Sequence, residues 1–106
     1  MDFKKYQKES RKTAIYDNLG KNLFYPVLGL VGEAGEIAEK LKRTLRGEKN
    51  TFIKKEISRE LGDVLWYLSQ LASEFDLSLD KIAIENIKKL KSRKKRGVLR
   101  GKGDNR

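Results

Sequence analysis

The sequence contains neither cysteine nor histidine. Without cysteine, disulfides, thiolate nucleophiles and thiolate-bound zinc or iron–sulfur sites are excluded. Without histidine, the usual general base and the commonest transition-metal ligand are missing. Carboxylates are then the strongest metal ligands that remain, and they favour hard cations such as Mg²⁺, with Mn²⁺ as a substitute. Any metal chemistry of this chain must therefore use oxygen ligands.

Long apolar runs are also missing. No stretch approaches the ~20 residues of a membrane span, and the first residues do not resemble a signal peptide. We therefore expect a soluble, cytoplasmic protein with no membrane partner. The 106 residues suffice for one small domain, and small domains bury only a modest fraction of their surface, so self-association is also expected.

The net charge of +10 is unevenly distributed along the chain. Residues 88–106 contain ten basic side chains and one acidic side chain, a net charge of +9, whereas residues 1–87 carry only +1. We expect a helical domain over residues 1–96 and a basic, glycine-containing tail over residues 97–106. Such a tail indicates a polyanionic partner, either nucleic acid or the phosphates of a nucleotide.

Apolar residues recur at helical spacing in four segments, and no β-pattern competes with them, so the fold class is all-α. Pro26 suits a first helical position, Gly47 a helix end, and Ser78 an N-cap. Asn50 or Thr51 could cap the third segment. The predicted helices run from about Asp2 to Tyr16, from Pro26 to Arg46, from just after Asn50 or Thr51 to Phe75, and from the cap at Ser78 towards Arg96.

Two pairs of acids suggest the chemistry. Glu33 and Glu36 are three residues apart in the second predicted helix, and Glu60 and Asp63 are three apart in the third. At about 100° per residue, the members of each pair face the same way, where like charges repel unless a cation lies between them. Four carboxylates on two antiparallel helices would form a Mg²⁺ site that leaves positions for water and phosphate.

The residues around these acids are unusual for helices. Gly29, Gly32 and Gly35 each cost about 1 kcal/mol relative to alanine, which indicates a close helix approach or room for a ligand. Trp66 lies almost opposite the apolar stripe of its helix, so we expect a partner subunit or a substrate base to cover it. Considered alone, the acid pairs could be ordinary solvated surface and Tyr67 an ordinary boundary residue.

The order and spacing of these motifs resemble a known family. The segment Glu33-Ala34-Gly35-Glu36 is followed, after twenty-three residues, by Glu60-Leu61-Gly62-Asp63. Together they are similar to the E-x-x-E and E-x-x-D motifs of MazG-like, all-α nucleoside triphosphate pyrophosphohydrolases. The segment from Asn86 to Arg93 is similar to the N-x-x-K-x-x-x-R element on the last helix of that family.

The resemblance implies a four-helix bundle-like fold completed by homo-oligomerisation, as a dimer or tetramer. It implies Mg²⁺-dependent hydrolysis of (deoxy)nucleoside triphosphates to the monophosphate and pyrophosphate, with nucleotide-pool cleansing as a biological role. In this chain the implied metal ligands and catalytic acids are Glu33, Glu36, Glu60 and Asp63. The implied substrate contacts are Tyr67 and Trp66 on the third helix and Asn86, Lys89 and Arg93 on the fourth.

Two other functions are compatible with parts of the sequence. A basic helical nucleic-acid-binding module would explain the tail and Trp66, but its paired acids would repel phosphates unless a metal were bound. A purely structural oligomerisation module would explain the apolar stripes, but it would give the glycines and the acidic faces no role. The base and sugar of the substrate are not determined by these patterns.

Overall fold

The computed structural model describes residues 1–106, and its regular structure is entirely helical, which confirms the predicted fold class. The helices are α1 (Phe3–Arg11), α2 (Phe24–Leu45), α3 (Ile53–Glu74) and α4 (Leu79–Lys95). None of the four combines the length and the apolar character needed to cross a membrane.

Most helix ends follow the local signals in the sequence. Ser78 caps α4 as predicted, because its Oγ accepts a hydrogen bond from the backbone N–H of Lys81 at 3.2 Å. Gly47 follows α2 with a φ of 92°, a left-handed conformation that glycine adopts without strain. Pro26 is the third residue of α2 rather than the first, and α3 begins at Ile53, one or two residues later than predicted, with Phe52 rather than Asn50 or Thr51 at the N-cap position.

The first predicted helix is too long. Helix α1 ends at Arg11 rather than Tyr16, and the chain then turns until α2 begins. The Glu74 side chain on α3 holds this turn, accepting hydrogen bonds from the Tyr16 hydroxyl at 2.7 Å and from the backbone N–H groups of Gly20 at 2.9 Å and Asn22 at 2.7 Å. These partners are more than fifty residues from Glu74 in sequence, so local periodicity could not show the break.

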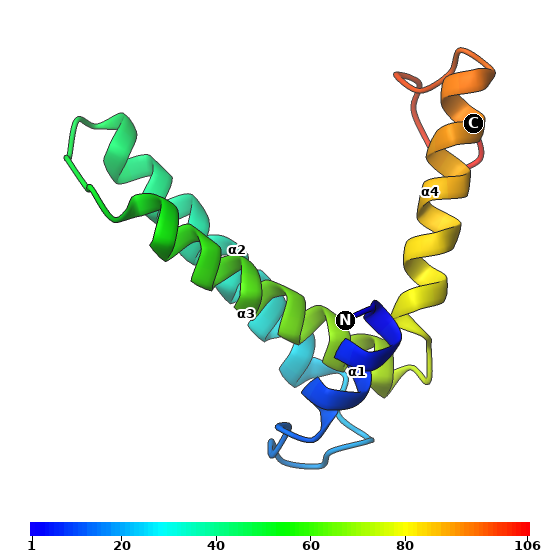
Figure 1. The fold of residues 1–106 in the computed structure, drawn as a ribbon, viewed down its shortest axis with the longest axis horizontal. Coiled ribbons are helices and arrows are strands. Elements are labelled where there is room, and N and C mark those ends of the chain that lie inside the picture. The colour runs from blue at the N-terminus through cyan, green and yellow to red at the C-terminus, as the bar shows by residue number, and fades with distance from the viewer.

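Helices α2 and α3 form a long antiparallel hairpin, α1 packs against α3 at the base of that hairpin, and α4 contacts α1 and then points away (Figure 1). The radius of gyration is 16.7 Å, whereas a compact domain of this length has about 13 Å. One chain therefore contains the four predicted helices without closing them into a compact bundle.

The buried core is small and partly polar, with only 8 of 106 residues buried. Ser10 on α1 lies against Ser69 on α3, with 2.9 Å between their hydroxyl oxygens, and Gln70 Nε2 donates to Ser10 Oγ at 3.2 Å. Gln7 links α1 to the start of α4, because its Oε1 accepts from the backbone N–H of Leu79 at 2.8 Å. The buried core therefore lies at the junction of α1, α3 and the start of α4.

Large apolar side chains lie exposed along the other faces of the helices. They belong to α2, α3 and α4, and include Val27, Leu28, Val31, Leu41, Leu61, Leu68, Ile82, Ile84, Ile87 and Leu90. Most of these residues belong to the predicted apolar stripes, which are only partly covered within one chain.

Candidate metal and nucleotide site

Three of the four predicted metal ligands meet on the hairpin. Glu33 of α2 and Glu60 and Asp63 of α3 each offer one carboxylate oxygen, and these three oxygens lie within 4.8 Å of one another. The antiparallel pairing of α2 and α3 brings the two i, i+3 motifs opposite each other, as the sequence predicts. Glu36 lies about one turn further along α2, exposed and outside this group.

The group is short of positive charge. The pKa of Glu33 is raised to about 7, because its protonated form can hydrogen-bond to Glu60, because burial disfavours its charge, and because Asp63, Glu60 and Glu36 repel it. The Oε2 atom of Glu60 is buried without a hydrogen-bond partner, which is unfavourable for a carboxylate oxygen. Clustered oxygen ligands with an unpartnered buried oxygen fit a hard divalent cation such as Mg²⁺.

Lys40 is a cation on this acidic face that the sequence analysis overlooked. Its Nζ lies 3.7 Å from Glu56 Oε2 and 4.0 Å from Glu60 Oε1, so it crosses the hairpin from α2 to α3. Its position four residues after Glu36 was the available signal, since i, i+4 residues share a helix face. In the structure, however, Lys40 pairs with acids of α3. It therefore neutralises one edge of the cluster and leaves the oxygens around Glu33 uncompensated.

Tyr67 borders the acidic group on α3. A Cβ atom added at Gly29 would overlap the Tyr67 ring, so this glycine permits a close approach between α2 and α3. Burial raises the pKa of Tyr67 first, followed by a hydrogen bond with Tyr25 and by the charges of Glu33 and Asp63. By contrast, a Cβ at Gly32 or Gly35 would meet nothing within 4 Å. A close approach between helices therefore explains the glycine at position 29. Gly32 and Gly35 instead border open space.

Trp66 is covered partly by its own chain. The sequence predicted instead that a partner subunit or a substrate base would cover it. Its Nε1 donates to Thr13 Oγ1 at 2.8 Å. Its ring meets Tyr67 edge-on, with 5.0 Å between centroids, and Tyr16 at 6.5 Å. Tyr16 in turn stacks on Tyr25 at 4.7 Å. The cause is the turn after α1, which the sequence analysis had assigned to helix and which brings Thr13 and Tyr16 onto α3.

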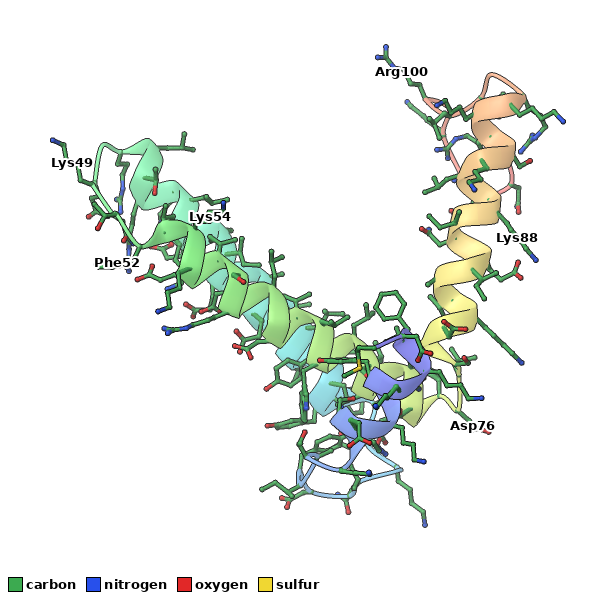
Figure 2. The ribbon with its side chains drawn as sticks, in the orientation of Figure 1. Lys49, Phe52, Lys54, Asp76, Lys88 and Arg100 are labelled. Atoms are coloured by element: carbon green, nitrogen blue, oxygen red, sulfur yellow. The ribbon has the colours of Figure 1, made fainter.

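The predicted substrate residues of α4 lie apart from the acidic group. Asn86 and Lys89 line a separate hollow at the junction of α3 and α4, together with Asp76 and Lys81. Lys88, the neighbour of Lys89, is labelled on the part of α4 that points away from the hairpin (Figure 2). The structure therefore brings together the acids and Tyr67, but it does not bring Asn86 or Lys89 to them within one chain.

Arg93 is also engaged elsewhere in the chain. It is only 4% exposed, because the residues after α4 fold back over it. Its guanidinium donates to the backbone carbonyl of Asp104 at 2.7 Å and lies 3.6 Å from the Asp104 carboxylate, which is also 3.7 Å from Lys89 Nζ. The basic tail thus supplies an acidic partner to two of the predicted phosphate contacts.

Comparison with known proteins bears on this arrangement. The chain is 45% identical to the Gene 37 protein of Mycobacterium phage L5, over 95% of this chain and 96% of that protein. No solved structure matches. Residues 26–98, which include most of α2, all of α3 and α4 and all the predicted site residues, match the family described as the MazG nucleotide pyrophosphohydrolase domain. The chain therefore belongs to the MazG nucleotide pyrophosphohydrolase family.

Proposed function

We propose that the protein hydrolyses (deoxy)nucleoside triphosphates to the monophosphate and pyrophosphate, with Mg²⁺ held by Glu33, Glu60 and Asp63 and, from the next turn, by Glu36. The observation that carries the proposal is the group of three carboxylates with an unpartnered buried oxygen on Glu60. Bound there, the cation would neutralise phosphate charge and lower the pKa of bound water. The acidic face of the hairpin is the binding site for the phosphates in this proposal.

The attacking water must also lose a proton in the proposed reaction, and one of these four carboxylates would accept it. The chain has no histidine or cysteine for that role. Tyr67, beside Glu33, would lie against the nucleotide.

We further propose that the active enzyme is a homodimer or a dimer of dimers. Exposed apolar faces on α2, α3 and α4 support this assembly, as does the direction of α4 away from the hairpin. In such an assembly Asn86 and Lys89 of one chain would meet the acidic face of another and receive the departing pyrophosphate. Sedimentation that finds only a monomer of 12.2 kDa at micromolar concentration would exclude the assembly.

The reaction is tested with a panel of NTPs and dNTPs in Mg²⁺, followed by product analysis in ¹⁸O-labelled water. The expected products are monophosphate and pyrophosphate, with the label in the monophosphate because water attacks the α-phosphorus. Diphosphate with orthophosphate, or label found only in pyrophosphate, would contradict the proposal. Activity should vanish in excess EDTA.

A further inference from the structure

A second hollow lies beside the acidic group, where the turn after α1 meets α2 and α3. It has a volume of about 450 Å³, and its lining includes three aromatic rings, Tyr16, Tyr25 and Trp66, as well as Ile15, Asp17 and Asn22. Ile15 is 92% exposed at its rim. Flat aromatic groups bind well to such surfaces, because stacking is favourable for every base.

The walls of this hollow are fixed by hydrogen bonds rather than by loose packing. The Glu74 side chain is fully buried and accepts hydrogen bonds from the Tyr16 hydroxyl and from the backbone N–H groups of Gly20 and Asn22. Trp66 Nε1 is fixed by Thr13 at 2.8 Å. A pre-formed wall of this kind loses little freedom when a ligand binds.

One polar group in the hollow is not used by the fold. Asn22 donates from its amide to the Asp17 carbonyl at 2.9 Å and accepts from the backbone N–H of Tyr25 at 3.0 Å. The Thr13 hydroxyl donates to the Ser10 carbonyl at 2.6 Å. Asp17, by contrast, is an exposed residue of the lining, and its carboxylate makes no hydrogen bond or ion pair within the chain. An ionised carboxylate only accepts hydrogen bonds, so it favours a ligand with donor groups.

The hollow is placed to receive one end of a nucleotide whose phosphates lie on the acidic face. Trp66 and Tyr67 follow Asp63 by about one helical turn, and the two rings are in contact with 5.0 Å between centroids. Tyr67 connects the two sites, since it meets Trp66 and Tyr25 on one side and borders the acidic group on the other.

We propose that this hollow binds the nucleobase and that Asp17 selects bases with an amino group on their pairing edge, guanine above all, over thymine and uracil. This inference rests on the proposed function and adds its base specificity. Guanine offers two adjacent N–H donors to one carboxylate, and adenine and cytosine each offer an amino group. Thymine and uracil flank their single N–H with two carbonyl oxygens, which a carboxylate repels.

The first test compares kcat/KM for dGTP, dATP, dCTP and dTTP. Wild-type protein should prefer dGTP over dTTP by about tenfold, the usual effect of hydrogen bonds to a charged group. Asp17→Asn should bring this ratio close to one. Glu48→Gln, a neutralised acid in the exposed α2–α3 turn, is the matched control and should keep the wild-type preference. Equal kcat/KM values for all four substrates, unchanged in Asp17→Asn, would overturn the proposal while leaving the pyrophosphohydrolase intact.

The second test does not depend on hydrolysis. Trp66 is the only tryptophan, so its fluorescence reports directly on a base bound in the hollow. Titration with dGMP should quench it at lower concentration than dTMP does, and Asp17→Asn should remove that difference. If no triphosphate is hydrolysed but dGMP still binds preferentially, the proposed function fails and the base site stands. No quenching by any of the monophosphates would refute the base site whatever the catalytic result.

Discussion

Two carboxylates on the same hairpin, Glu33 and Glu74, occupy opposite electrostatic environments. Glu74 is buried among donors, and its hydrogen bonds with Tyr16, Asn22, Arg11 and Gly20 outweigh desolvation and lower its pKa to about 2. Glu33 lies among other acids, and its pKa is raised to about 7. The first environment is electrostatically complete, whereas the second lacks a cation. This difference separates a carboxylate that holds the fold from one to which the proposed function assigns metal binding.

The largest expected effect is on catalysis. Glu60→Gln should lower kcat by about a hundredfold or more, because an interaction with developing charge is worth several kcal/mol in a water-poor site. The same change should leave the free energy of unfolding of the metal-free protein unchanged or higher, since it relieves repulsion with Glu33 and Asp63. Steady-state kinetics and urea unfolding measure the two effects. Marked destabilisation would show that Glu60 has a structural role like that of Glu74.

The matched change at the other carboxylate should act on stability. Glu74→Gln leaves Arg11 without its ionic partner and places an amide where four donors converge, which should cost about 3 kcal/mol of unfolding free energy. Urea unfolding followed by circular dichroism measures this loss. Lys12 and Glu9 form an exposed pair at 3.1 Å, and Glu9→Gln is the control that should change stability very little. A small effect at Glu74 would mean that this carboxylate does not stabilise the fold more than an exposed acid does.

Metal binding should change only the incomplete environment. Added Mg²⁺ at ten times its Kd should raise the unfolding free energy by about 1.4 kcal/mol and Tm by about 5 °C or more. Thermal unfolding of EDTA-treated wild type and of Glu60→Gln measures this effect, and the variant should respond far less. An equal shift in both proteins would place the cation elsewhere.

The two pKa shifts predict opposite pH dependences in the metal-free protein. The stabilisation from Glu74 is complete above its unfolded-state pKa, near 4.5, and is lost as the pH falls towards its folded-state pKa of about 2. The contribution of Glu33 is complete below 4.5 and is lost as the pH rises through about 7. Metal-free protein should therefore be most stable near pH 4–5. Urea unfolding from pH 3 to pH 8 tests this, and Glu33→Gln should flatten the alkaline limb.

The smallest effect is expected at a third acid, Asp104, whose side chain is 89% exposed beside Lys89 and Arg93. An ion pair with an exposed carboxylate contributes little to stability, and the buried Arg93 would keep its hydrogen bond to the Asp104 backbone carbonyl. Asp104→Asn should therefore leave the urea midpoint unchanged within error, which makes it a reference point for the other two acids. A clear loss of stability would mean that the fold of the tail is coupled to that of α4.

The sequence was sufficient to predict the four helices and the cap at Ser78, since each depends on local spacing. The convergence of Glu33, Glu60 and Asp63 also required the antiparallel pairing of α2 and α3, and Glu36, predicted with them, lies outside the group. The sequence was insufficient for the turn after α1 and for Glu74. That turn is set by hydrogen bonds to a residue more than fifty positions away, and Glu74 looks like an ordinary acid at a helix end. The direction of α4 could not be predicted from the sequence either, because the apolar residues Ile87 and Leu90 do not specify which surface covers them.

The separation of α4 from the hairpin has a genetic consequence. In the proposed dimer each active site takes its acids from one subunit and its phosphate contacts from the other. A Glu60→Gln chain and a Lys89→Ala chain, each inactive alone, would then rescue one another when mixed, since one of the two sites in each heterodimer combines two intact halves. Random reassortment of equal amounts should restore about a quarter of wild-type activity. Two defective alleles of this gene, expressed together, would behave as a partly functional one.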